Sequence, residues 1–233
     1  MSNGGGAVDL VEVHAALADP LRLAVAQYLY DTDETPGRLG ERFSVPSNLL
    51  AHHLGVLAAA GVVTRRRSEH DGRRQYLQLS HFEPMVRQLV GVGIGARPQP
   101  ERVLFVCTRN SARSKLASAL WRRHSLLPSA DAGTAPATAP HHTANAVAER
   151  LGLSLDRAMR DVERARRPGD LVVTVCDHVQ ETWDHDGPGL HWSVPDPVPG
   201  GAEADFVGAA ETLEARISIL APQFQKESSH DQH

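Results

Sequence analysis

The chain has 233 residues, of which 41% are hydrophobic and 22% charged, so two compact domains with apolar cores are expected. No apolar run reaches the ~18 residues of a membrane span, and the first residues lack the pattern of a signal peptide, which predicts a cytoplasmic protein with no membrane partner. The formal net charge is −4 and there are two cysteines, Cys107 and Cys176, so a disulfide framework is excluded.

The first 90 residues predict an α+β domain of helices followed by a hairpin. Apolar residues at helical spacing predict helices over 8–18, 20–30, 36–43, 48–60 and 82–92. Ser47 is the expected N-cap of the fourth helix. Residues 62–67 and 74–79 alternate as two strands around the turn sequence His70-Asp71-Gly72. This order of elements predicts a winged helix-turn-helix domain over residues 1–90.

The predicted hairpin carries the basic cluster of this half. Its members are Arg65, Arg66, Arg67, Arg73 and Arg74. In the simplest interpretation these arginines are solvated side chains at the ends of the strands. Beside a helix-turn-helix pattern, however, a basic cluster favours contact with nucleic acid.

Two motifs in this half resemble the ArsR family of metalloid-responsive repressors, over about residues 8–90. They are Ala18-Asp19-Pro20-Leu21-Arg22 and the stretch from Ala51 to Val63. The resemblance implies a homodimer on a two-fold operator, with the fourth helix in the DNA major groove and the arginines of the wing on the backbone. Residues that would face bases or phosphates are Ser47, Asn48, His52 and His53.

Residues 1–98 contain no cysteine. Trivalent arsenic is soft and prefers sulfur ligands, so we expect no metal or metalloid site in this half. Any control of DNA affinity by thiol chemistry must therefore come from the second half.

Residues 91–101 predict a linker, because glycines end the preceding helix and prolines prevent another. Beyond it, strands are expected at 103–106, 129–134, 170–176 and 191–194, and helices at 114–125, 142–151 and 202–220. This alternation predicts an α/β domain over 102–222 with a four-stranded parallel doubly wound sheet. Residues 223–233 predict a flexible tail.

The most informative stretch joins the first of these strands to its helix. Five residues separate Cys107 from Arg113, so a loop can curl its backbone N–H groups around a tetrahedral oxyanion, with the thiol and the guanidinium beside it. The dipole of the following helix favours the thiolate form. The predicted oxyanion-binding residues are Thr108, Arg109, Asn110, Ser111, Ala112, Arg113 and Ser114.

Cys176 and Asp196 also follow predicted strands, so they should lie at the same edge of the sheet as Cys107. The loop sequence, Asp131-Ala132-Gly133-Thr134 and the Asp196-Pro197 pair resemble the low-molecular-weight protein tyrosine phosphatase family and the arsenate reductases that share its fold.

The resemblance implies a role for several of these side chains. Cys107 would be the nucleophile, Arg113 the oxyanion clamp and Asp196 the general acid. Asn110 and Ser114 would hold the loop and stabilise the thiolate. For Asp196 the competing interpretation is a turn residue before proline.

Phosphatase and reductase are distinguished by the surroundings of the loop. Phosphotyrosine phosphatases of this family place aromatic residues after the Asp-Pro pair, whereas Val198, Pro199, Gly200 and Gly201 follow here. Cys176 is placed to attack a thiol–arsenate adduct at sulfur, although a buried filler cysteine is the alternative. Ala112 and Trp183 stand where thioredoxin-coupled relatives carry further cysteines.

The leading prediction is therefore a DNA-binding regulator fused to a thiol-dependent arsenate reductase. It needs no tightly bound cofactor and no metal, and takes electrons from mycothiol, glutathione or a redoxin; thioredoxin acting on a Cys107–Cys176 disulfide stays open. The alternatives are a regulator whose second domain is a non-catalytic oxyanion or thiol sensor, and a low-molecular-weight phosphatase tethered to DNA.

Overall fold

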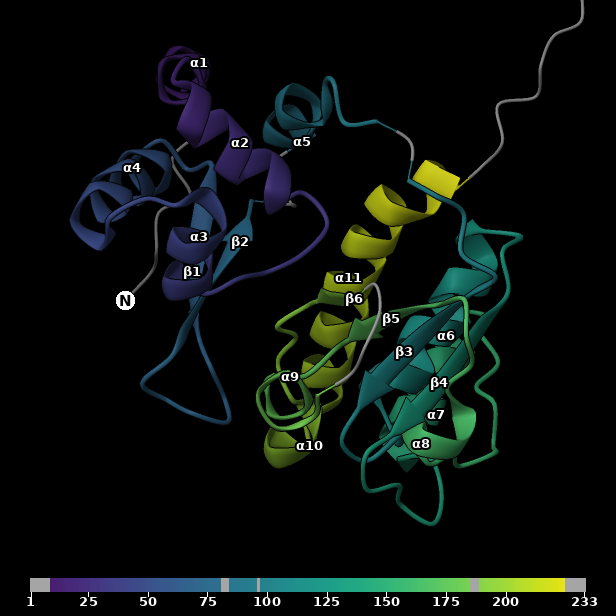
Figure 1. Ribbon diagram of the computed structural model, residues 1–233. Helices are drawn as coiled ribbons and strands as arrows, with labels where there is room; N and C mark the ends of the chain where they lie inside the picture. The colour runs from purple at the N-terminus through teal and green to yellow at the C-terminus, as the bar shows by residue number, and fades with distance from the viewer. Residues whose placement is uncertain (1–8, 81–83, 96, 185–188, 225–233) are drawn as a thin grey trace, which may run out of the picture. The chain divides into compact units, whose positions relative to one another are not determined.

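The computed structural model describes residues 9–80, 84–95, 97–184 and 189–224. The chain divides into two compact units, residues 1–94 and 95–233, and each has its own apolar core (Figure 1). Within the described residues no helix has the length and apolarity needed to cross a membrane.

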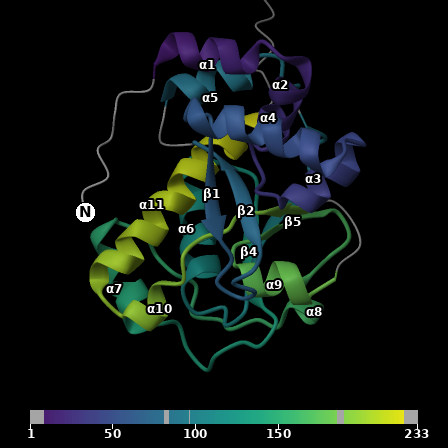
Figure 2. The ribbon, with the colours of Figure 1, turned by 90° about the vertical axis from the view of Figure 1, so that its left-hand side faces the viewer.

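The first unit is a helix-turn-helix with an antiparallel wing, as predicted. Its elements are α1 (Leu10–Leu17), α2 (Pro20–Tyr28), α3 (Pro36–Phe43), α4 (Ser47–Ala59), β1 (Val63–Arg67), β2 (Gln75–Leu79) and α5 (Pro84–Gly91). The hairpin of β1 and β2 extends away from the helices (Figure 2). The start predicted for the last helix, at residue 82, lies outside the described residues.

The turn between α3 and α4 is held by the backbone. Ser44 adopts a left-handed conformation with φ 53°, and the Val45 N–H donates to the Gly40 carbonyl at 3.0 Å, which satisfies an orphan carbonyl of α3. The prediction of Ser47 as N-cap is wrong. Pro46 is the N-cap and makes no side-chain cap bond, because its φ of −56° and extended ψ already direct the chain into the helix.

The α4 helix is anchored by three leucines at helical spacing. Leu50, Leu54 and Leu57 are 2%, 1% and 0% exposed and pack in the core of this unit. Their burial determines which side of the helix stays free: Asn48, His52 and Gly55 are exposed.

The second unit is an α/β domain with a four-stranded parallel sheet, as predicted. Its strands are β3 (Arg102–Cys107), β4 (Ser129–Gly133), β5 (Asp170–Thr174) and β6 (Gly189–His191), in the order β4-β3-β5-β6. Its helices are α6 (Arg113–His124), α7 (His142–Arg150), α8 (Val162–Ala165), α9 (Asp177–Thr182), α10 (Pro197–Gly200), α11 (Glu203–Leu220) and the 3-10 helix η1 (Ala221–Phe224).

The connections leave β3 toward β4 and then return to β5 on its other side. Successive connections therefore lead to opposite sides of β3, and the switch point lies between the parallel strands β3 and β5. In such sheets ligands bind in the crevice at the carboxyl ends of these two strands. Helix α6 packs on β3 and β4 and against α11.

Several predictions for this unit are wrong. The strand expected over 170–176 ends at Thr174, and the short helices α8, α9 and α10 were not predicted. The last strand was expected over 191–194 but ends at His191, because β5 ends at Thr174 and offers no further ladder partner after the Trp192 N–H bonds to the Thr174 carbonyl. The tail was expected from residue 223, yet Phe224 is 6% exposed and packs against Trp121 at a centroid distance of 6.2 Å. Residues 225–233 lie outside the described part of the chain.

Candidate active site

The loop from Cys107 to Arg113 turns its carbonyl oxygens toward the segment 134–141. Thr134, Ala135, Ala137 and His141 donate their N–H groups to the carbonyls of Cys107 (3.3 Å), Thr108 (2.8 Å), Arg109 (2.9 Å) and Ser111 (2.8 Å). Over the described residues, no backbone N–H of residues 108–112 donates to another residue. These N–H groups and the N-terminus of α6 are therefore available as donors, and an oxyanion is the class of ligand that such donors bind.

Two positions allow the loop to adopt this shape. Asn110 has a positive φ of 49°, a conformation that non-glycine residues rarely adopt. A Cβ atom at Gly133, where β4 ends, would lie 2.6 Å from the Thr108 carbonyl oxygen and 2.8 Å from the Asn110 nitrogen. Only glycine lets β4 approach the loop this closely.

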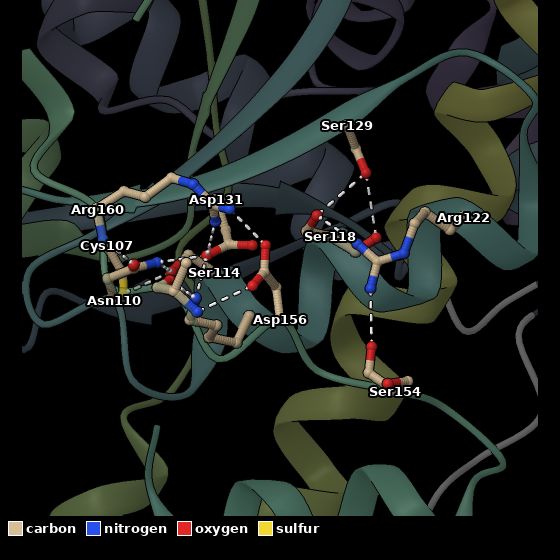
Figure 3. A network of polar contacts seen from close by, with 12 residues as sticks. Cys107, Asn110, Ser114, Ser118, Arg122, Ser129, Asp131, Ser154, Asp156 and Arg160 are labelled. Carbon is tan, nitrogen blue, oxygen red and sulfur yellow. Dashed lines mark hydrogen bonds and ion pairs between the residues drawn. The ribbon is translucent and has the colours of Figure 1, made fainter. Parts of the chain in front are cut away.

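The Cys107 thiol is buried and has a hydroxyl partner. Its Sγ lies 3.2 Å from Ser114 Oγ, and Ser114 Oγ accepts a hydrogen bond from Asn110 Nδ2 at 3.0 Å (Figure 3). Because the amide donates to Ser114, the hydroxyl proton of Ser114 is free to point at the sulfur. Ser114 can therefore donate a hydrogen bond to the nucleophilic sulfur.

Arg113 joins the loop to the Asp-Pro segment. Its Nη2 lies 3.0 Å from Asp196 Oδ2, and its Nη1 donates to the Val194 carbonyl at 3.1 Å. Asp196 also caps α10, since its Oδ1 accepts from the Val198 N–H at 3.2 Å. This cap is the turn role that the sequence analysis gave as the alternative to general-acid catalysis by Asp196. The ion pair also places the same carboxylate beside the Arg113 guanidinium. The side chain of Asp196 is 34% exposed, so it can exchange protons with solvent.

Cys176 reaches the loop from the end of β5. Its Sγ lies 3.6 Å from Thr108 Oγ1, and the residue is 1% exposed. Burial raises the pKa of the Cys176 thiol; the Arg113 charge and the Thr108 hydrogen bond oppose this, while a negative charge on Cys107 adds to it. The two cysteines thus share one electrostatic environment, although Cys176 lies 68 positions after Thr108 in the sequence.

Three charged residues lie behind the loop. Asp131 was expected only as part of a family motif, and no sequence pattern singled out Lys115 or Arg160. The Lys115 side chain is fully buried and its Nζ lies 2.6 Å from Asp131 Oδ1. A lysine in the first turn of a helix is normally solvated, and nothing in the local sequence indicates that this one is buried.

His141 was also missed. Its ring stacks on Phe206 at 4.9 Å and on His142 at 4.6 Å, and its backbone N–H supports the loop at Ser111. Burial lowers the pKa of His141, as does the neighbouring His142, whereas the Asp196 charge opposes the shift. The imidazole is therefore neutral at pH 7 beside the oxyanion loop.

The predicted DNA-binding residues are not equally accessible. Ser47, Asn48 and His52 are exposed on α4, while the His53 side chain is 12% exposed and lies 3.6 Å from Asp19. On the wing, Arg65 and Arg67 are exposed and form no ion pair within the described residues.

The remaining wing arginines are paired with acidic residues of the turn. Arg66 lies 2.6 Å from Glu69, and Asp71 lies 3.1 Å from Arg73 and 3.5 Å from Arg74. The hydrogen bond from Arg73 lowers the pKa of Asp71, so this carboxylate is charged near neutral pH.

Comparison with known proteins assigns both units. Residues 102–230, more than half of the chain, match the model of the low molecular weight phosphotyrosine protein phosphatase family. The chain belongs to this family. The predicted likeness of residues 102–222 to it is confirmed, and the fold is similar to that of an arsenate reductase from Archaeoglobus fulgidus, with 28% identity, a TM-score of 0.46, and coverage of 52% of this chain and 98% of that one. It is also similar to the tyrosine phosphatase Wzb from Escherichia coli K30, with 22% identity, a TM-score of 0.49, and coverage of 55% and 100%.

Ahead of the phosphatase-family domain, residues 17–66 match a helix-turn-helix domain model. Over 57 residues, 24% of this chain, the sequence is 40% identical to the HTH-type transcriptional repressor SmtB of Mycobacterium tuberculosis. The match spans 42% of the length of that repressor. The predicted helix-turn-helix is thereby confirmed, and its sequence is similar to that of this repressor.

Proposed function

We propose that the protein is a DNA-binding transcriptional regulator fused to a thiol-dependent arsenate reductase. The observation that carries the second half of the proposal is the buried Cys176 thiol, which contacts Thr108 of the oxyanion loop 3.6 Å away. A phosphatase needs a single thiol, whereas reduction of an oxyanion needs two thiol electrons and therefore a second sulfur.

The first step forms a covalent adduct. The Cys107 thiolate attacks the arsenic of arsenate held by the loop N–H groups and Arg113. A sulfur–arsenic bond forms, and one arsenic–oxygen bond breaks. The departing hydroxyl leaves as water with a proton that solvent supplies through the partly exposed carboxyl group of Asp196, 3.0 Å from Arg113.

The second step transfers two electrons. Cys176 loses its proton to solvent, and its sulfur attacks Cys107 Sγ. A disulfide forms while the sulfur–arsenic bond breaks, and the bonding pair stays on arsenic, which leaves as arsenite. Two thiols are oxidised to one disulfide and arsenic(V) is reduced to arsenic(III). An external thiol, mycothiol, glutathione or a redoxin, then reduces the disulfide.

The first unit would bring the chain to an operator as a homodimer. The exposed polar face of α4 and the arginines of the wing are the groups that would contact DNA. Apolar side chains that stay exposed on α1 and α5, Leu10 (41%), Val11 (75%) and Met85 (44%), support pairing of two copies through these helices.

An arsenite assay tests the enzymatic half. Purified protein is incubated with arsenate and each candidate thiol system, and arsenite is quantified; hydrolysis of p-nitrophenyl phosphate is measured in parallel. We expect arsenite with at least one thiol system, and loss of at least 1,000-fold in Cys107→Ser, because the serine hydroxyl is not a thiolate.

Cys176→Ser is the matched control for the second thiol, since it keeps the oxyanion loop intact. It should retain adduct formation and lose the intramolecular disulfide. Ester hydrolysis without arsenite would instead assign a phosphatase, and neither activity would assign a sensor.

A further inference from the structure

A buried ion pair lies directly behind the oxyanion loop. Lys115 in α6 and Asp131 in β4 have side chains that are 0% and 2% exposed, and Nζ lies 2.6 Å from Oδ1. Removing two charges from water costs more than a buried pair usually returns, so such a pair is weak evidence for a role in stability. Its position suggests another role.

A chain of polar contacts connects the Asp131 carboxylate to the Cys107 thiol. Asp131 Oδ1 accepts a hydrogen bond from Asn110 Nδ2 at 2.8 Å, and the same nitrogen donates to Ser114 Oγ, which contacts Cys107 Sγ (Figure 3). The Asn110 Oδ1 accepts from the Arg160 backbone N–H at 2.9 Å. Every polar atom of this buried amide thus has a partner.

The amide contacts matter because Asn110 has an unfavourable backbone conformation. With φ at 49°, it is in the left-handed region, and the direction of the loop N–H groups depends on its staying there. Side-chain hydrogen bonds to fixed partners offset this cost. Asp131 is the partner that belongs to a strand of the sheet, so it ties the loop to the rigid part of the domain.

We propose that Asp131, charge-compensated by Lys115, is a positioning residue that holds Asn110 and thereby keeps the loop in its oxyanion-binding shape. Neither residue touches the anion. The ammonium supplies the compensation that a buried carboxylate requires, and Arg160, whose Nη1 is 3.7 Å from Asp131, adds to it. The inference rests on the proposed oxyanion binding and adds the residues that orient the loop.

Two double variants separate positioning from charge. Lys115→Met with Asp131→Asn removes both charges but keeps an acceptor for Asn110, whereas Lys115→Met with Asp131→Leu removes the charges and the acceptor. The two differ only in that acceptor, since asparagine and leucine are similar in shape. Thermal unfolding of both reports any purely structural effect.

The measured quantity is the affinity for inorganic phosphate. Full-length protein is alkylated with iodoacetamide at increasing phosphate, and mass spectrometry of the tryptic peptide 103–109 follows Cys107 separately from Cys176. Protection gives an apparent Kd. We expect the asparagine variant to stay within about twofold of the wild type and the leucine variant to bind phosphate about tenfold more weakly, the effect of one buried hydrogen bond.

Equal phosphate affinities in the two double variants would overturn the proposal, whatever their thermal stabilities. If the leucine variant does not fold, Asp131→Ala in the Lys115→Met background makes the same comparison. Absence of protection in the wild type would overturn the proposed oxyanion binding itself, and this inference with it, so the two failures are distinguishable.

Asn110→Gly provides a second test, because glycine adopts the positive φ without side-chain support. If Asp131 acts through Asn110, exchanging asparagine for leucine at position 131 should no longer change the phosphate Kd in this background. A persistent tenfold difference would contradict the proposed route and overturn the proposal.

Discussion

At the scale of single residues, the two cysteines differ in the polar groups that surround their sulfur atoms. Cys107 lies at the start of a loop rich in donors and beside the Ser114 hydroxyl, whereas Cys176 is 1% exposed and its Sγ lies 3.6 Å from Thr108 Oγ1. The Cys107 sulfur thus has a hydroxyl and a helix N-terminus beside it, whereas burial raises the pKa of the Cys176 thiol. A nucleophile and a resolving thiol need this difference, because the second thiol should act only after the first has reacted.

This difference predicts the pH dependence of the second step. Burial raises the pKa of Cys176, so its thiol is protonated at pH 7 and becomes the attacking thiolate as the pH rises. Single-turnover release of arsenite, followed by rapid quench between pH 7 and 9, should therefore accelerate by up to about tenfold per pH unit. Cys176→Ser is the control and should lack this phase. A rate independent of pH would argue against Cys176 as the resolving thiol.

At the scale of elements, the wing combines exposed and paired arginines. Strand alternation places Arg65 and Arg67 on one side of β1, while Asp71 in the turn holds Arg73 and Arg74. The same carboxylate accepts the Arg73 backbone N–H at 3.1 Å, so it shapes the turn as well as neutralising charge. The turn thus reduces the positive field of the wing that would meet the phosphates.

Asp71→Asn removes the negative charge and keeps the backbone hydrogen bond. We predict that DNA affinity rises about two- to fivefold at low salt and that the salt dependence steepens, since the arginines are released toward phosphate. Fluorescence anisotropy with a labelled duplex over a range of salt concentrations measures both. Glu211→Gln, which removes one negative charge from the second unit, is the control. Unchanged affinity in Asp71→Asn would exclude the wing turn from the DNA contact.

At the scale of the whole molecule, the proposed thiol chemistry and the proposed DNA contact belong to different units. Both cysteines lie in residues 95–233, and the helix-turn-helix lies in residues 1–94. If arsenate or redox state controls transcription, the signal must begin at Cys107 and reach α4 through the chain. Linkage then requires operator binding and adduct formation to change one another by the same factor.

We predict that arsenate with a thiol reductant lowers the operator affinity of the wild type by about tenfold and leaves that of Cys107→Ala unchanged. Gel-shift titrations of both proteins, with and without arsenate and arsenite, measure this. The same affinity in all conditions would show that the two units work independently.

The sequence by itself determined the features that depend on residues close together along the chain. The helix-turn-helix, the wing, the order of the strands and of the longer helices, and the loop from Cys107 to Arg113 all follow from local periodicity and turn residues, whereas the short helices α8, α9 and α10 do not. Element boundaries that depend on contacts with distant residues could not be predicted from the local sequence. The last strand ends at His191 because its neighbour β5 ends, and Phe224 belongs to the core because Trp121 lies beside it.

The tertiary structure decided which distant side chains meet. It brings Cys176 to Thr108, Asp196 to Arg113, and Lys115 and Asp131 behind Asn110, and it turns His53 toward Asp19 rather than leaving it fully exposed. The physical reason is that burial depends on the packing of whole elements. No local pattern distinguishes a lysine on a solvated helix face from one enclosed between α6 and the sheet.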